Sequence, residues 1–184
     1  MAFIRVPEGV PGIRSLAMFR PETGQHLYAL AQVLLRGDSP LTPAERELIG
    51  AHVSARNNCL FCRDSHAAAA RELFGGQRDV VDCVIENKPS DSISLKLKAL
   101  LNIAAKVQLN GRAVQPEDIG QARHNGATDR EIHDTVLIAA TFSMFNRYVD
   151  GLNSLTPTEP AEYAQMGKRL ASVGYVPPSG SQKQ

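Results

Sequence analysis

Apolar residues recur along most of this chain at intervals of three and four, which is the period of an amphipathic helix and not of a strand. Between positions 28 and 34, for example, residues 28, 30, 31, 33 and 34 are apolar. Together with the Gly, Pro and Asn residues that interrupt it, this pattern predicts helices over residues 23–35, 43–56, 59–74, 80–88, 92–109, 116–125, 128–152 and 159–171. No segment alternates convincingly as a strand would, so the sequence predicts an all-α fold.

Three of the expected helices begin with the Thr-x-x-Glu pattern of a capping box, in which hydroxyl and carboxylate satisfy free backbone N–H groups of the first turn. The three boxes cover residues 42–45, 128–131 and 156–159. The first and third also put a proline, Pro43 and Pro157, at the first helical position, where its missing N–H costs nothing. We therefore expect helices to begin at these three places.

With 184 residues the chain fits one domain of ordinary size. Hydrophobic residues make up 43% and charged residues 21%, close to the average for globular proteins. Only residues 177–184 are too poor in apolar side chains to pack, so we expect a single helical bundle over residues 1–176 and a flexible tail.

Charge and hydropathy argue against two classes of function. The net charge is +1, with 20 basic residues scattered among 19 acidic ones, so no basic face for nucleic acid is indicated. Apolar runs fall short of the roughly 20 residues that cross a bilayer. The N-terminus has no basic and apolar segments like those of a secretory signal, so we expect a cytoplasmic protein that binds neither membranes nor nucleic acid.

The candidate chemistry lies in one cluster, Cys59-x-x-Cys62-x-x-x-His66. On a helix these three side chains share one face, since they are three and four residues apart. Asn57-Asn58 interrupts the preceding helix, which predicts a tight helical hairpin that could bring Glu47 and Ser54 toward His66. A carboxylate there would fix the tautomer of the imidazole and support it as a base.

Two thiols beside a base can carry out a redox cycle. A helix N-terminus and a nearby imidazole both favour the thiolate, the form of cysteine that attacks. A thiolate that meets a peroxide becomes a sulfenic acid, and a second cysteine one turn away can condense with it to a disulfide. A partner dithiol, such as a lipoyl protein or a thioredoxin-like protein, would then reduce the disulfide.

The segment from Glu47 to His66 resembles the AhpD-like alkylhydroperoxidases of the carboxymuconolactone decarboxylase superfamily, most closely their "peroxidase-related" branch. The segment Phe142-Ser143-Met144-Phe145-Asn146-Arg147 is also similar to that branch. The resemblance implies an all-helical AhpD-like fold, homo-oligomers and reduction of hydrogen peroxide or organic hydroperoxides by a cysteine pair.

By the same resemblance Cys62 attacks, Cys59 resolves, and His66 with Glu47 relays the proton. The well-studied members have a second histidine between the two cysteines, where this chain has Phe61, so the resemblance implies a different or slower route for proton transfer here. Thioredoxin-type sites favour the opposite assignment, with Cys59 as the attacking thiol, because in those sites the first cysteine is the more acidic. We follow the position of His66 and predict that Cys62 attacks.

Other functions remain open at this stage. The chain could be a thiol-disulfide oxidoreductase that exchanges with partner proteins, or a lactone decarboxylase, as the superfamily name allows. A structural zinc site has the right Cys-x-x-Cys spacing but no second ligand pair, so we expect neither a metal nor a cofactor. The long apolar helix over residues 128–152 predicts an oligomer, either a trimer or a hexamer.

The remaining candidate residues have weaker claims. Cys83 lies among valines and is expected to be a small core residue. His52 is expected at the surface or in the core, and three further histidines, His26, His124 and His133, are expected to be structural or solvated.

Overall fold

The computed structural model of the protein describes residues 2–176, so the tail expected over 177–184 lies outside the described residues. Within that part the elements are α1 (Gly12–Phe19), α2 (Pro21–Arg36), α3 (Pro43–Arg56), α4 (Leu60–Leu73), α5 (Arg78–Ile85), α6 (Leu95–Leu109), the short 3-10 helix η1 (Gly111–Ala113), α7 (Pro116–His124), α8 (Asp129–Gly151) and α9 (Pro160–Val173). The described residues form no strand, which confirms the expected all-α, single-domain fold.

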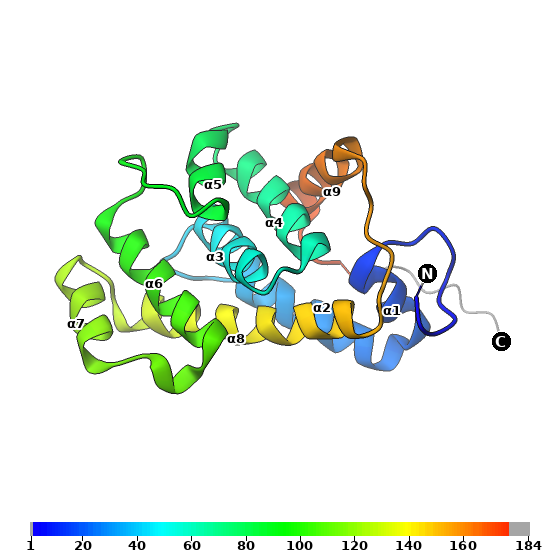
Figure 1. Ribbon diagram of the computed structural model, residues 1–184, viewed down its shortest axis with the longest axis horizontal. Coiled ribbons are helices and arrows are strands. Elements are labelled where there is room, and N and C mark those ends of the chain that lie inside the picture. The colour runs from blue at the N-terminus through cyan, green and yellow to red at the C-terminus, as the bar shows by residue number, and fades with distance from the viewer. Residues whose placement is uncertain (1, 177–184) are drawn as a thin grey trace.

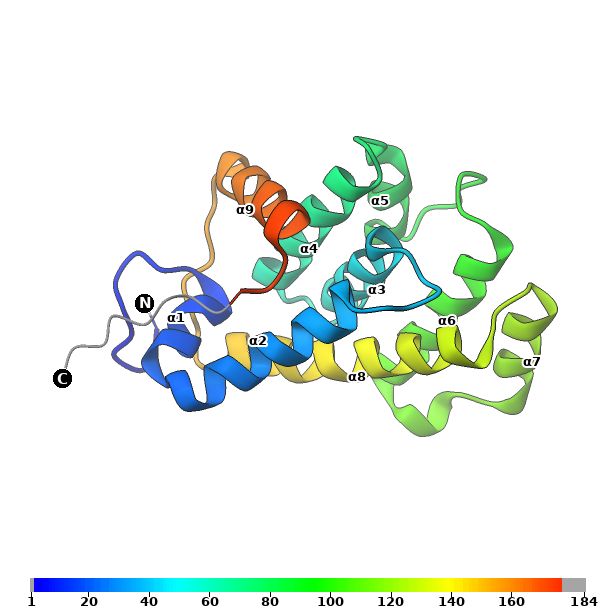
Figure 2. The same cartoon turned by 180° about the vertical axis from the view of Figure 1, so that it is seen from behind.

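The long helix α8 runs along one side of the molecule (Figures 1 and 2), where it packs against α1, α3, α6 and α7. Helix α3 lies at the centre, in contact with α4, α6 and α8. Helix α9 covers α4 from the outside, and α1 and α2 close the same end of the bundle (Figure 1). The segments that carry the candidate chemistry, α3 and α4, are therefore neighbours in the middle of the fold.

Helix α3 is covered on every side, because all residues from 46 to 54 are buried. Buried polar groups need hydrogen-bond partners, and the helix carries four such residues. Arg46, for example, donates from Nη1 to the carbonyls of Leu34 at 3.0 Å and Gly37 at 2.9 Å. These two hydrogen bonds connect α3 to the end of α2 and fix the position of one helix relative to the other.

The expected hairpin between α3 and α4 is present and is built on a left-handed residue. Asn58 has φ of 57°, a conformation that asparagine tolerates better than most residues. The N–H of Asn58 donates to the carbonyl of Ala55 at 3.1 Å, and the N–H of Cys59 donates to that of Ser54 at 3.0 Å. This pair of bonds is a Schellman motif, which ends α3 and leaves Cys59 as the residue that caps α4.

Two of the three capping boxes form as expected, at the starts of α3 and α8. The third prediction was wrong, because α9 begins at Pro160 and not near Pro157. A proline restricts the residue before it to extended backbone, and Glu159 has φ of −84° and ψ of 122°. The carboxylate therefore sits before the first turn and cannot complete the box.

Helix α1 was not anticipated from the sequence. It follows Pro11 without a side-chain cap and starts at Gly12, which has φ of 55°. A Cβ at Gly12 would lie 1.9 Å from the ring of Phe61, so only glycine lets α1 approach α4 this closely. The ring of Phe61 thereby becomes a packing contact between these two helices.

His52 lies in the core, 8% exposed, and neither ring nitrogen has a hydrogen bond of normal geometry to a described residue. Burial, aided by the charge of Arg56, lowers the pKa of His52 from 6.5 to about 4. An unfolded chain takes up this proton below pH 6.5, whereas the folded chain resists it, so folding stability is lost as pH falls from 6.5 toward 4.

We expect acidification across that window to cost about 3 kcal/mol of unfolding free energy through His52 alone, since one pKa unit corresponds to about 1.4 kcal/mol. Urea denaturation at several pH values measures this loss. His52→Leu should flatten the profile, whereas His26→Gln, at an exposed histidine, should leave the wild-type slope. An unchanged slope in His52→Leu would show that other groups cause the acid sensitivity.

Candidate functional site

Glu47 and His66 form the centre of the candidate site. Glu47 Oε2 lies 2.7 Å from His66 Nδ1, and the carboxylate is fully buried. The hairpin makes this contact, since it folds α4 back along α3 and brings together residues 19 positions apart. The expected approach of Glu47 to His66 is confirmed as a contact.

Two further residues, which sequence reasoning missed, complete the cluster around the carboxylate. Arg36 donates from Nη2 to Glu47 Oε1 at 2.6 Å, and the Tyr175 hydroxyl donates to the same oxygen at 2.7 Å. Arg36 also lies over the Tyr175 ring, 5.3 Å from its centroid. Glu47 is therefore held by a cation, a phenol and an imidazole at once.

Tyr175 reaches this position because the chain turns back immediately after α9. Gly174 has φ of 67°, and the N–H of Tyr175 donates to Gln32 Oε1 at 2.7 Å. The Tyr175 ring then lies parallel to the His66 ring, with centroids 6.0 Å apart. No local motif marks a tyrosine so far from Glu47 in sequence, whereas Arg36, in the last turn of α2, was recognisable only as a helix-terminal cation.

The surroundings of Glu47 favour its ionised form. Burial alone would raise the pKa of the carboxyl, but attraction to His66, the hydrogen bond from it, Arg36 and Tyr175 together hold the pKa below its usual value. Conversely, burial and the negative charge of Glu47 raise the pKa of Tyr175 well above its usual value. Tyr175 is thus a permanent hydrogen-bond donor at physiological pH, and Glu47 a permanent acceptor.

This arrangement determines which nitrogen of His66 can act as a base. A carboxylate can only accept, so Nδ1 carries the proton and donates it to Glu47. Nε2 of the neutral ring is then free, and it has no hydrogen-bond partner among the described residues. The edge of the ring is fixed by Phe142, whose centroid lies 4.5 Å away in an edge-on contact.

His66 faces a cavity of about 110 Å³ that opens between α1, α2, α4 and α9. Its walls are mainly aromatic and aliphatic, and they include Phe61, Phe142, Phe145 and Met166. Phe61, at the position where family members have a second histidine, thus supplies an apolar wall. It supplies no proton-transfer group.

The two cysteines lie at the N-terminus of α4, one turn before His66. Cys59 caps the helix and Cys62 is in its first turn, and their exposed fractions are 0% and 3%. Both are free thiols. The partial positive charge of a helix N-terminus favours a thiolate at this place.

The two thiols differ in their surroundings. A hydrogen bond with the Cys62 side chain, together with burial, raises the pKa of the Cys59 thiol far above its usual value, and a hydrogen bond with Asp150 adds to this shift. Cys59 therefore keeps its proton. No hydrogen bond joins Cys62 to His66, although both residues are described, so a proton moving between them needs an intervening water or a substrate oxygen.

Ser54 does not join this site. Its hydroxyl donates to the carbonyl of Gly50 at 2.8 Å and accepts from Asn146 Nδ2 at 3.0 Å. Seven residues separate Glu47 from Ser54, which is about 10 Å along a helix, so Ser54 lies beside the hairpin turn. Asn146 Oδ1 accepts a second hydrogen bond, from Asn57 Nδ2 at 2.8 Å, and this bond connects the hairpin turn to α8.

The other candidate residues lie away from the cluster. Cys83 is half-buried beside a surface hollow, so the expectation of a core residue was wrong. Its place in α5 puts the neighbouring residues Val81 and Val84 toward the core instead. The three histidines expected to be solvated or structural are exposed, namely His26, His124 and His133. Arg147 is exposed on α8.

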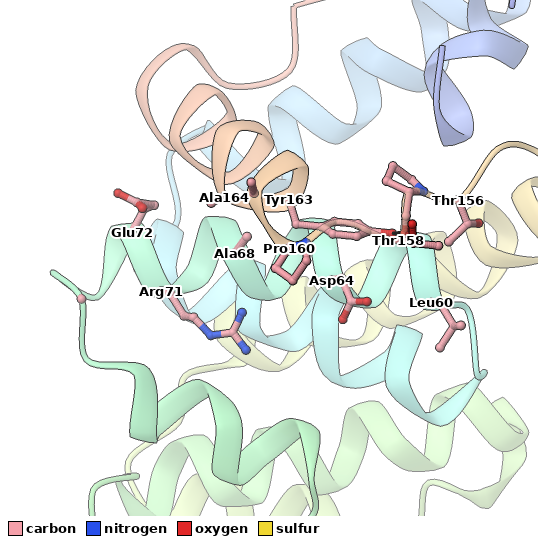
Figure 3. A pocket seen from close by; sticks show the side chains of 13 residues that line it. Leu60, Asp64, Ala68, Arg71, Glu72, Thr156, Thr158, Pro160, Tyr163 and Ala164 are labelled. Carbon is pink, nitrogen blue, oxygen red and sulfur yellow. Dashed lines mark hydrogen bonds between the residues drawn. The ribbon is translucent and has the colours of Figure 1, made fainter. Parts of the chain in front are cut away.

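A wider hollow, a groove of about 780 Å³, lies on another face of α4. Figure 3 shows Leu60, Asp64 and Ala68 along that face, with Pro160 and Tyr163 opposite them. Neither cysteine nor His66 lines this groove. The groove and the cavity beside His66 are thus on different sides of the same helix.

Across residues 2–176, no three or more His, Cys, Asp or Glu side chains are grouped so that they could hold a metal ion. In the same part of the chain, every helix is too short or too polar to cross a membrane.

Comparison with known proteins gives a consistent picture. Residues 21–88, which include Arg36, Glu47, both cysteines and His66, match the family model of the carboxymuconolactone decarboxylase family. The uncharacterized protein YdfG of Bacillus subtilis is 28% identical over 109 residues, covering 59% of this chain and 74% of its own.

Two solved structures share the fold. An uncharacterized peroxidase-related protein from Ralstonia eutropha, described as an alkylhydroperoxidase AhpD core, has a TM-score of 0.76 and 29% identity, covering 92% of this chain and 83% of its own. An uncharacterized peroxidase-related protein from Silicibacter has a TM-score of 0.73 and 27% identity, covering 84% and 79%. The chain is therefore similar to the carboxymuconolactone decarboxylase family over residues 21–88, and it shares the fold of AhpD-like, peroxidase-related proteins.

Proposed function

We propose that this protein is a thiol-dependent peroxidase that reduces hydrogen peroxide or organic hydroperoxides through a Cys59–Cys62 disulfide cycle. The observation that supports this most is the base next to the thiols: His66, anchored through Nδ1 to buried Glu47, lies one turn after Cys62 in the first turn of α4. The family and the peroxidase-related relatives agree with it.

In the first step the Cys62 thiolate attacks the terminal oxygen of the peroxide. The S–O bond forms as the O–O bond breaks, so Cys62 is oxidised to a sulfenic acid and the peroxide leaves as an alkoxide or hydroxide. His66 Nε2 takes the thiol proton through a water or the peroxide itself, and returns it to the leaving oxygen. Glu47 stabilises the imidazolium that exists between these two transfers.

In the second step the Cys59 thiol attacks the sulfur of the sulfenic acid. The S–S bond forms, the S–O bond breaks, and the hydroxyl group leaves as water with the proton of Cys59. The raised pKa of Cys59 supports this order, because the protonated thiol waits while Cys62 attacks. A dithiol reductant, which we propose to be a lipoyl or thioredoxin-like protein of the cytoplasm, then restores both thiols.

Thiol-disulfide exchange with a protein is the main alternative. The two cysteines are 0% and 3% exposed, so exchange with a protein requires the fold to open around the thiols, as does the reduction step that ends the peroxidase cycle. Rapid mixing of the reduced protein with peroxide and with a protein or lipoyl disulfide separates the two functions. Faster oxidation by the disulfide would favour exchange, and turnover that survives full thiol alkylation would favour a lactone decarboxylase.

We also propose a homo-oligomer. Leu137 and Met144 are exposed on α8, 37% and 46%, seven residues apart and therefore on one face. A second copy of the chain would cover this face. Light scattering of the purified protein measures the state, with a trimer or a hexamer expected and a monomer contradicting the proposal.

One equivalent of peroxide should convert the reduced protein to a form lighter by two hydrogen atoms. Trypsin cuts after Arg56 and Arg63, so both reactive cysteines fall in the single peptide 57–63. We expect this peptide to resist alkylation after peroxide and to become alkylated again after reduction, as measured by mass spectrometry.

Cys83→Ser is the matched control for this experiment, since it removes the third cysteine of the chain, which lies away from the site. The same oxidised peptide should form in this variant at the wild-type rate. A disulfide that involves Cys83, or a peptide 57–63 that stays alkylatable after peroxide, would contradict the proposed cycle.

A further inference from the structure

The cavity beside His66 has two chemically different ends. Most of its wall is aromatic and aliphatic. Ser65, His66 and Tyr175 also line it, as do three further polar residues, Tyr28, Arg14 and Arg169. Both arginines are exposed, which puts them at the mouth. A ligand with an apolar body and one polar end would match this arrangement of side chains.

The two arginines at the mouth have no partner of their own. Neither Arg14 nor Arg169 makes an ion pair or a side-chain hydrogen bond with any residue in the range 2–176. Both act on the charge of Tyr28, since they offset part of the rise in its pKa that burial causes. The two arginines line the same cavity as Tyr28, Arg14 from α1 and Arg169 from α9.

The Tyr28 hydroxyl is also available. The residue is 7% exposed, and its hydroxyl has no hydrogen bond to a described residue. The hydroxyl oxygen is not one of the fully buried polar atoms that lack a partner, so water or a ligand in the cavity can reach it. Two free guanidinium groups and one free hydroxyl are the donors that a carboxylate requires.

The inner end of the cavity lies next to the reacting thiol. Its wall on α4 consists of Phe61, Ser65 and His66. Cys62 is next to Phe61 in sequence and precedes Ser65 and His66 by three and four residues, so it lies under that wall. A peroxide group at the inner end would therefore lie beside the free Nε2 of His66, with Cys62 directly behind the wall that Phe61, Ser65 and His66 form.

We propose that this cavity binds short organic hydroperoxides that carry a carboxylate, with the hydroperoxide toward His66 and the carboxylate between Arg14, Arg169 and Tyr28. This inference rests on the proposed peroxidase function and specifies its substrate. The volume of about 110 Å³ is below the roughly 150 Å³ of a cavity that holds benzene, so the cavity suits a thin alkyl chain whose carboxylate lies outside the enclosed volume, at the exposed arginines. Hydrogen peroxide would react with the same thiols but has no carboxylate to bind Arg14 and Arg169.

Binding can be tested without turnover. The reduced protein is titrated with hexanoate and with hexanol, and amide NMR shifts report where and how tightly each binds. We expect hexanoate to shift residues that line the cavity and to bind at least tenfold more tightly than hexanol. Arg14→Gln combined with Arg169→Gln should weaken hexanoate binding about tenfold, and the melting temperature of this variant shows that it is folded.

Substrate preference gives the second measurement. The ratio of kcat/KM for 6-hydroperoxyhexanoate to that for 1-hydroperoxyhexane should fall about tenfold in the double arginine variant. Lys168→Gln is the matched control, because Lys168 is an exposed cation beside Arg169 that does not line the cavity, and it should keep the wild-type ratio.

The possible results are distinct. Equal binding of hexanoate and hexanol, or unchanged hexanoate binding in the double variant, would overturn the inference even if the protein is a peroxidase. Absence of turnover with every peroxide, alongside selective hexanoate binding at the cavity, would instead contradict the peroxidase and leave the carboxylate site standing.

Discussion

Cys62→Ser should abolish peroxide turnover, because a serine hydroxyl is not a nucleophile at neutral pH and cannot become a sulfenic acid. We expect a loss of at least about 1000-fold in kcat/KM, the scale on which removing a catalytic nucleophile acts. Cys59→Ser should differ in kind. It should consume one equivalent of peroxide and then stop, with Cys62 held as a sulfenic acid.

Coupled peroxide consumption measures the turnover of both variants, and dimedone labelling followed by mass spectrometry detects the trapped sulfenic acid. Labelling at Cys62 in Cys59→Ser confirms the order of the two thiols. Labelling at Cys59 in Cys62→Ser, together with wild-type consumption of the first equivalent, would reverse it. Cys83→Ser serves again as the control and should turn over normally.

Glu47→Gln should have the second largest effect, on both activity and stability. The buried amide no longer neutralises Arg36, and breaking one side of a buried ion pair typically costs about 3–5 kcal/mol. Against a total stability of roughly 5–15 kcal/mol, this is a large part of what holds the fold together. Urea denaturation measures the loss.

The activity should fall for a different reason. The amide can donate a hydrogen to His66 Nδ1, which favours the tautomer with the proton on Nε2 and removes the free base. We expect a loss of about 100-fold in kcat/KM, the lower range of what general acid–base catalysis contributes. A folded Glu47→Gln protein with wild-type turnover would show that the pair holds the structure and does not move protons.

Tyr175→Phe is the matched comparison for Glu47→Gln. It removes one hydrogen bond to the carboxylate and keeps the ring beside His66, so it should cost about 1–3 kcal/mol of unfolding free energy and leave the tautomer of His66 unchanged.

The cluster around Glu47 also makes folding stability depend on pH. Since the pKa of Glu47 lies below its usual value, the stability that the cluster provides is fully present at pH values above that usual value. It should be lost as pH falls through the lowered one.

The sequence was most informative where the chemistry is local. Residues 59, 62 and 66 share a helix face through their spacing alone, and Asn57-Asn58 marks the turn that brings Glu47 to His66. Arg36 and Tyr175 could not be found in this way, because their contacts with Glu47 depend on where α2 and the end of α9 lie in the bundle. The prediction that Ser54 approaches His66 was wrong for a similar reason, since Ser54 is bound by Asn146 on α8.

Helix boundaries show the same division between local and long-range causes. The capping boxes at Thr42 and Thr128 were recognised because all their groups lie within one turn. The box expected at Thr156 failed at a proline only one residue beyond its end, Pro160. Helix α1 was missed because its packing on Phe61 depends on a glycine that carries no periodic signal.

The hydrogen bond between Tyr175 and Glu47 also orders events during synthesis of the chain. Arg36, Glu47 and His66 emerge from the ribosome early, whereas Tyr175 follows Glu47 by 128 residues. At synthesis rates of about 5–20 residues per second, the carboxylate waits for several seconds with one donor missing and one side uncovered. The full set of donors around Glu47 can therefore assemble only after α9 and the turn that follows it have been made.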